Sequence, residues 1–269
     1  MEILNAVIIV SVIGIIIGIG LSVASSFFSV PKDETEEKIR ECLPGANCGA
    51  CGFSGCDGYA LAIAKGETDN ISLCAPGGNG VAKALAQITG KAAEEIAPVA
   101  AVVRCNGTCE NCNEKLNYEG IKTCKAASMM FGGQKACIYG CLGYGDCMNV
   151  CSENAISICD GVARVDLSRC IACGKCLKAC PKGLIDLLPK GKTQALVMCR
   201  NAEKGAVAMK VCKVSCIGCA KCQKACPQNA ITVENFLARV DANKCNGCGE
   251  CRGVCPKNCI ELFQSTKNS

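Results

Sequence analysis

Two stretches near the C-terminus decide the fold: residues 216–227 read CIGCAKCQKACP, and residues 245–256 read CNGCGECRGVCP. Each is a C-x2-C-x2-C-x3-C-P run, and its first three cysteines can bind one compact iron–sulfur cube. In runs of this form, the fourth cysteine ligates the cluster of the other run. Zinc sites usually place a longer spacer between their cysteine pairs. The two runs therefore predict two [4Fe–4S] clusters held by exchanged ligands.

With this exchange, each run supplies three cysteines to its own cluster and its fourth cysteine to the cluster of the other run. The first cluster takes Cys216, Cys219, Cys222 and Cys255, and the second takes Cys245, Cys248, Cys251 and Cys226.

The same pattern occurs earlier in the chain. Residues 151–188 align without a gap on residues 226–263, and each copy reads as a short strand, a turn, a second strand and a cysteine loop. Such a repeat is interpreted before any single motif. It predicts two units that resemble two-cluster bacterial ferredoxins, at residues 134–190 and 213–269, joined by a connecting segment at 191–212.

The earlier copy has one regular run and one irregular run. The irregular run has longer cysteine spacings, and Ser152 stands where a proline is expected, but the distance between the two runs is the same as in the later copy. We therefore expect the exchange to persist. One cluster is assigned Cys137, Cys141, Cys147 and Cys180, and the other Cys151, Cys170, Cys173 and Cys176.

Two further cysteine groups precede the repeat. The spacing C-x2-C-x4-C-x17-C is that of a single-cluster domain at residues 31–97, and a less regular group lies at residues 98–133. The first group is Cys48, Cys51, Cys56 and Cys74; the second is Cys105, Cys109, Cys112 and Cys124, where Cys199 or Cys212 could replace Cys112. The chain is thus expected to hold about six [4Fe–4S] clusters.

The remaining cysteines carry weaker signals. Cys159 aligns with Glu234 of the other copy, and Cys259 aligns with Leu184, so neither position requires sulfur. We interpret both, and Cys42, as packing or surface residues. The roles of Cys199 and Cys212 stay open.

The composition favours metal over disulfides. The chain has 29 cysteines, an odd number, in 269 residues and no histidine, so imidazole ligands and imidazole bases are excluded. With aromatic residues at 4%, we expect metal ligation to supply much of the folding free energy. The net charge of +5 treats thiols as neutral, and six clusters would move it to about −7, so we expect no nucleic-acid partner.

The N-terminal residues 4–30 carry no charge and are rich in Ile and Val. A run of this length predicts a transmembrane helix, so residues 1–30 are expected to be an anchor. Lys32, Lys38 and Arg40 follow the run, which favours a cytoplasmic position for the rest of the chain. The expected fold class is α+β: a transmembrane helix, a small helical [4Fe–4S] domain and two ferredoxin-like units.

The motifs LPGANCGACGFSGCDGYA (residues 43–60) and KACIYGCLGYGDC (residues 135–147), followed by the two ferredoxin-like units, resemble the RnfB subunit family of the Rnf complex. The resemblance covers nearly the whole chain. It implies an electron-transfer subunit of an ion-translocating (Na+ or H+) ferredoxin:NAD oxidoreductase at the cell (inner) membrane. Its implied partners are soluble ferredoxin as donor and the flavin-bearing and integral membrane subunits.

The sequence shows neither a G-x-G-x-x-G dinucleotide motif nor intramembrane carboxylates for an ion path. The chain therefore has no complete active site, and catalytic residues are expected in its partners. One alternative is the iron–sulfur subunit of a hydrogenase, formate or polysulfide enzyme, from which the CGACGFSGC module distinguishes it. Another is a metal-storage or redox-sensing protein.

Overall fold

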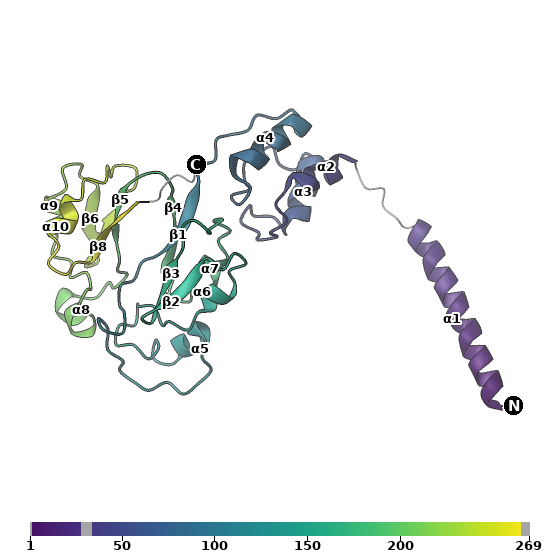
Figure 1. Cartoon of the computed structure of the whole chain (residues 1–269), viewed down its shortest axis with the longest axis horizontal. Helices are drawn as coiled ribbons and strands as arrows, with labels where there is room; N and C mark the ends of the chain where they lie inside the picture. The colour runs from purple at the N-terminus through teal and green to yellow at the C-terminus, as the bar shows by residue number, and fades with distance from the viewer. Residues whose placement is uncertain (1, 28–33, 265–269) are drawn as a thin grey trace.

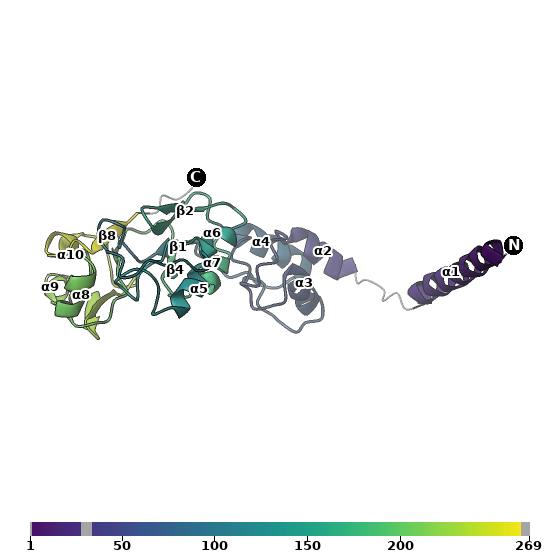
Figure 2. The same cartoon turned by 90° about the horizontal axis from the view of Figure 1, so that it is seen from below.

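The computed structural model describes residues 2–27 and 34–264, except for some side chains of the first helix. A helical domain, a first ferredoxin-like unit and a second unit follow one another along the molecule, with the first unit in the middle (Figures 1 and 2). Mixed helix and strand content agrees with the α+β prediction.

The apolar N-terminal run forms α1 (Glu2–Phe27). The prediction that it spans a membrane is corrected: within the described residues, no helix is both long enough and apolar enough to cross a bilayer.

The small domain contains α2 (Glu34–Cys42), α3 (Cys56–Ala64) and α4 (Gly78–Thr89). Acidic residues in the first turn of α2 and Arg40 in its last turn complement the helix dipole. Ile39 of α2 is fully buried in the core of the domain, where it joins Tyr59 and Leu85. These contacts hold the three helices around the loop that carries the first cysteines.

The first ferredoxin-like unit is built on a hairpin of β2 (Ile156–Cys159) and β3 (Val162–Val165). Asp160 and Gly161 form its turn with φ of 48° and 74°, the left-handed values that a type I′ Asp-Gly turn requires. The short helices α5, α6 and α7 carry cysteines beside this hairpin; they are Cys124–Met129, Asp146–Asn149 and Lys175–Ala179.

The second unit repeats this arrangement. β6 (Ile231–Glu234) and β7 (Leu237–Val240) form the hairpin. The helices α8, α9 and α10 are Gly205–Val211, Lys221–Lys224 and Glu250–Gly253. Gly218 passes so close to the hairpin turn that a Cβ there would meet the Phe236 backbone at 2.8 Å, which explains why glycine stands in this cysteine loop.

Each unit gains one strand from outside its predicted boundaries. β1 (Val99–Val103) pairs with β4 (Ile185–Pro189), and β5 (Gln194–Val197) pairs with β8 (Ile260–Phe263), both antiparallel. Residues 98–133 and 191–212, expected as a separate cysteine region and a connecting segment, thus each contribute a strand to the neighbouring unit.

The two units meet through side chains of these added strands. Val102, Leu196, Met198 and Phe263 form a small buried cluster. Arg104, after β1, donates its Nε–H to the Val197 carbonyl of β5 at 3.0 Å. The segments that carry Cys105 and Cys199 therefore lie at the junction of the units.

Candidate metal centres

Cysteines surround four cavities of nearly equal size in the ferredoxin-like part. Their empty volumes, which include open space at the mouths, are about 360, 350, 360 and 340 Å³, and we name them cavities I to IV in that order. Their cysteine linings are Cys151, Cys170, Cys173 and Cys176 in cavity I; Cys124, Cys141, Cys147 and Cys180 in cavity II; Cys105, Cys112, Cys137, Cys199 and Cys212 in cavity III; and Cys216, Cys219, Cys222, Cys255 and Cys259 in cavity IV.

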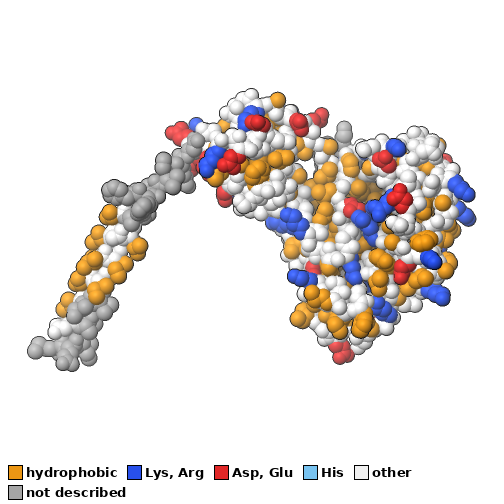
Figure 3. Space-filling model, turned by 180° about the vertical axis from the view of Figure 1, so that it is seen from behind, with side chains coloured by type: hydrophobic (Ala, Val, Ile, Leu, Met, Phe, Trp, Pro, Cys, Tyr) orange, Lys and Arg blue, Asp and Glu red, His pale blue; other side chains and the backbone are white. Residues whose placement is uncertain are grey.

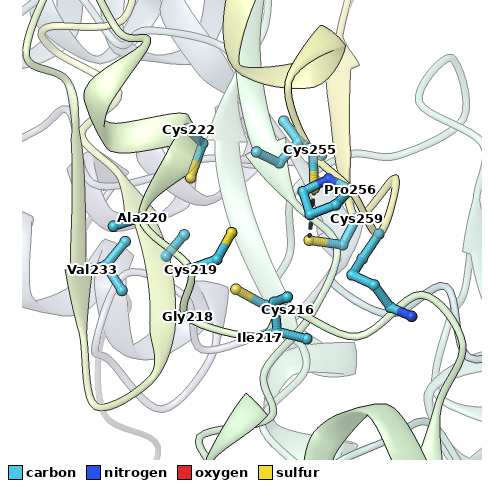
Figure 4. A pocket seen from close by; sticks show the side chains of 13 residues that line it. Cys216, Ile217, Gly218, Cys219, Ala220, Cys222, Val233, Cys255, Pro256 and Cys259 are labelled. Carbon is cyan, nitrogen blue, oxygen red and sulfur yellow. Dashed lines mark hydrogen bonds between the residues drawn. The ribbon is translucent and has the colours of Figure 1, made fainter. Parts of the chain in front are cut away.

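Cavity IV brings together the four cysteines assigned to the first cluster of the later copy. Figure 4 shows Cys216, Cys219 and Cys222 on one loop, with Cys255 reaching them from the other run. Ile217 and Val233 supply apolar walls. This is the crossed arrangement that the sequence predicts for this group.

The partner group, Cys245, Cys248, Cys251 and Cys226, also lies together. The pKa of Cys251 is raised first by burial and then by the thiols of Cys245, Cys226 and Cys248. Cys226 packs against the same core that buries Cys245 and Cys251. The structure thus brings Cys226 to the other run, as the sequence predicts.

Cavity I contains the regular group of the first unit as assigned from sequence. Its pKa values show how close the thiols are: burial, followed by Cys170 and Cys173, raises the pKa of Cys176 to about 11. Cys151 closes the group from the irregular run.

Cavity II differs from the expected grouping, because Cys124 lines it in place of Cys137. Asp146 holds Cys124 there: its carboxylate accepts hydrogen bonds from the backbone N–H groups of Cys124 and Lys125, at 2.8 and 2.9 Å, at the start of α5. Burial, followed by Cys141 and Cys124, raises the pKa of Cys147 to about 12.

Cavity III lies at the junction and collects cysteines from both units. Of the group expected around Cys105, the structure retains Cys105 and Cys112 and adds Cys137, Cys199 and Cys212. Cys109 points elsewhere: it is exposed, and its backbone N–H donates to the Asp160 carbonyl in the hairpin turn at 3.0 Å. Cys109 and Cys124, both predicted for this site, are therefore outside it.

The buried side chain of Lys135 lies next to cavity III, because it contacts Gly107, which lines that cavity. Lys135 is 2% exposed, and its Nζ donates to the carbonyls of Gly107 and Gly161 at 2.7 and 2.8 Å. A hydrogen bond with Cys212 is the main cause that lowers the pKa of Cys112 to about 6, and the Lys135 charge acts in the same direction. An ammonium group here would offset the negative charge of a thiolate-bound cluster.

The helical domain brings its four cysteines together as well. The pKa of Cys74 is raised by burial and by the thiols of Cys56, Cys48 and Cys51. The Asn47 side chain accepts a hydrogen bond from the Cys56 backbone N–H at 2.7 Å and so anchors the loop to the start of α3. Cys42 packs half-buried at the edge of this core.

Backbone amides point at several of these sulfurs, in matching places of the two units. Ala101 of β1 donates to Cys170 Sγ at 3.4 Å, and Ala195 of β5 donates to Cys245 Sγ at 3.3 Å. N–H groups aimed at ligand sulfur stabilise the thiolate that a cluster needs. The added strands therefore serve the sites as well as the core.

In each of the four cavities, thiols and apolar side chains surround a space. The described part of the chain contains no group of three or more His, Cys, Asp or Glu side chains arranged to hold one metal ion. Thiolates around a compact guest, with amides directed at the sulfurs, match [4Fe–4S] ligation.

Sequence reasoning allowed Cys199 or Cys212 beside Cys105, but it did not expect Cys137 in the same site, nor Cys259 beside the ligands of cavity IV. One signal was available: VVRC (residues 102–105) resembles LVMC (residues 196–199), and both segments form a strand that ends shortly before a cysteine. Cys259 is buried in the core of the second unit, as expected for a packing residue, and it also lines cavity IV. Cys159 is exposed at the end of β2, as expected for a residue without a ligand role.

Three family models match the chain. A putative Fe–S cluster model matches residues 43–76, a 4Fe–4S binding domain matches residues 162–185, and a 4Fe–4S dicluster domain matches residues 215–259. The first covers the cysteine loop of the helical domain, and the other two fall in the two ferredoxin-like units. The models agree with the cofactor type.

Curated relatives match over most of the chain, and all three described here are the B component of an oxidoreductase complex. The chain is 44% identical to that component of the Na(+)-translocating ferredoxin:NAD(+) oxidoreductase complex of Acetobacterium woodii, over 90% of this chain and 73% of that protein. It is 39% identical to the one from the proton-translocating complex of Clostridium ljungdahlii, over 87% and 82%. It is 38% identical to the one from an ion-translocating oxidoreductase complex of Methanosarcina acetivorans, over 90% and 91%.

Proposed function

Because this chain belongs to the RnfB family of the ion-translocating ferredoxin:NAD oxidoreductase complexes, we propose that it carries single electrons through about six [4Fe–4S] clusters bound in its cysteine groups. A [4Fe–4S] cluster supplies reversible one-electron reduction at low potential. The family assignment confirms the resemblance drawn from the motifs.

The proposed ligand sets follow the cavities where these differ from the sequence assignment. Cys124 replaces Cys137 beside Cys141, Cys147 and Cys180, and the junction site draws four ligands from the five cysteines of cavity III. The other sets remain as assigned: Cys48, Cys51, Cys56, Cys74; Cys151, Cys170, Cys173, Cys176; Cys216, Cys219, Cys222, Cys255; and Cys226, Cys245, Cys248, Cys251.

The observation that carries the proposal is the continuity of the sites across the junction. Leu184 lines both cavity II and cavity III. Cys105 Sγ of cavity III accepts a hydrogen bond from the Cys141 backbone N–H of cavity II at 3.4 Å. On the other side, Cys199 of cavity III is hydrogen-bonded by the Cys216 backbone N–H of cavity IV. Cavity III thus connects the two units.

The helical domain extends this series at the other end. Lys175 lines cavity I, and its Nζ donates to the Ala46 carbonyl at 3.3 Å, two residues before Cys48. This contact supports a route from the first unit to the Cys48 group. We infer that electrons travel between the second unit and the helical domain through cavities IV, III, II and I.

The rest of the enzyme belongs to partner subunits. The relatives' names describe translocation of Na+ in one case and of protons in another. Since ions are translocated across a membrane, we infer that this chain works at one, with its cysteine-rich part on the cytoplasmic side. NAD reduction, flavin chemistry and the ion path are assigned to flavin-bearing and integral membrane subunits.

We infer that soluble ferredoxin donates electrons at the second unit. Cys219 and Cys248 are exposed there, and Lys244, Arg252 and Lys257 flank the last cysteine loop. Figure 3 shows Lys and Arg side chains spread over the ferredoxin-like part. Basic side chains would steer an acidic ferredoxin to this end, and salt would screen the attraction.

A variant that empties the junction tests the relay. With Cys199 and Cys212 both changed to Ser, rapid-freeze EPR after mixing with reduced ferredoxin should show reduction in the second unit but a delay of at least tenfold in the first. Cys159→Ser is the control, because this thiol is exposed and does not line cavities I to IV. Equally fast reduction of both units in the double variant would contradict the relay.

A further inference from the structure

Cys259 is a fifth thiol in cavity IV. It lies immediately before β8, is 3% exposed, and its Sγ is 3.7 Å from Cys255 Sγ, the contact dashed in Figure 4. Cys216 and Cys219 line the same cavity, and the Cys259 side chain also contacts Cys216. The thiol therefore faces two proposed ligands from a buried position.

The repeat provides a natural comparison at this position. Leu184 occupies the equivalent place in cavity II and is 1% exposed. The backbone surroundings match: the Leu184 carbonyl accepts from the Arg104 N–H at 2.8 Å, and the Cys259 carbonyl accepts from the Met198 N–H at 2.8 Å. Cavity II has four cysteines without a thiol at this place, so a complete ligand set does not require one.

Cluster ligation decides which sulfur donates. The direction of this hydrogen bond rests on the ligand set proposed above: there, Cys255 and Cys216 would bind iron as thiolates and carry no proton, so the S–H at this contact would belong to Cys259. We propose that Cys259 is not a ligand but donates its S–H to the Cys255 ligand sulfur and so raises the reduction potential of the cluster in cavity IV relative to that in cavity II.

The expected rise in reduction potential follows from the negative charge that the cluster gains when it is reduced. Reduction adds one negative charge, which spreads onto the ligand sulfurs, so a hydrogen-bond donor at sulfur stabilises the reduced cluster more than the oxidised one. Leu184 offers no donor to cavity II. The second unit would then hold an incoming electron more firmly than the first, an asymmetry that acts within the relay proposed above.

The test exchanges the two side chains. In the full-length, cluster-loaded chain, Cys259→Leu should retain its iron and shift the reduction equilibrium of the cavity IV cluster by roughly tenfold toward the oxidised form, about 59 mV for one electron. Leu184→Cys should shift the cavity II cluster the opposite way. Cys259→Ser, which keeps a donor, should lie closer to wild type than Cys259→Leu.

EPR-monitored titration with chemical mediators measures both shifts without ferredoxin, so the result does not depend on the relay. Resonance Raman of the iron–sulfur stretches should change with Cys259→Leu and change less with Cys259→Ser. An unchanged potential in Cys259→Leu would overturn the proposal. Loss of the cluster and of about four irons would also overturn it, because Cys259 would then be a ligand. If Cys259→Leu does not fold, Leu184→Cys decides: a raised potential supports the proposal, and an unchanged one refutes it.

Discussion

Asp186→Asn should loosen the junction between the two units. Asp186, on β4, accepts from Arg104 Nη1 at 3.1 Å and from Arg200 Nη2 at 2.6 Å, and Arg200 also lines cavity III. Asn keeps one oxygen acceptor but carries no charge, so the two guanidinium groups lose their shared counter-ion. Breaking a fully buried pair costs about 3–5 kcal/mol. Because the three side chains are 15 to 30% exposed, we reduce this to about 2–3 kcal/mol.

For a protein of this size, about 2–3 kcal/mol corresponds to a fall of roughly 4–12 °C in the unfolding midpoint. Anaerobic differential scanning calorimetry of the cluster-loaded protein, followed in parallel by cluster absorbance, measures it. Glu261→Gln is the matched control: Glu261 is the repeat equivalent of Asp186, but it is exposed and bonds the Asn106 side chain. The Glu261→Gln substitution should change the free energy of unfolding by no more than about 0.5 kcal/mol. A midpoint for Asp186→Asn equal to that of the control would refute the role of this network.

Three further outcomes are expected. Anaerobic chelation of iron should unfold most of the chain from Cys48 onward, because thiols line its cores; a cooperative thermal transition of the apo protein by circular dichroism would argue against this. Cys226→Ser should abolish the EPR signal of the cluster on the last run and spare its neighbour, with Cys255→Ser giving the reverse; local losses would exclude the exchange. Cys124→Ser should remove the cluster of cavity II, and Cys137→Ser should instead affect cavity III; identical spectra of the two variants would reject the regrouping.

Local chemistry was predictable from the sequence. Three cysteines with two residues between each pair can bind the same cluster, whatever the position of their loop in the fold. Cys216, Cys219 and Cys222 could therefore be grouped from spacing alone. The form of the two runs indicated the crossed fourth ligand. The repeat extended this exchange to the first unit, because the two runs are equally far apart in both copies. The family could be inferred because the whole order of motifs is specific.

The apolar N-terminal run was a different case. Its composition predicted a helix, and α1 is present. Among the described residues, however, no helix combines the length and the apolar character needed to cross a membrane.

Tertiary structure alone decided which distant cysteines meet. Spacing placed Cys124 with Cys105 and Cys137 with Cys141, and it left Cys199 and Cys212 open. The structure groups them differently, because many residues with variable backbone angles separate each of these cysteines from its neighbours in space. Their grouping depends on the pairing of β1 with β4 and of β5 with β8, which brings the two units together at cavity III. The same holds for Cys259, whose alignment with Leu184 suggested packing. Its chemistry follows from a sulfur contact that forms only when the chain has folded around cavity IV.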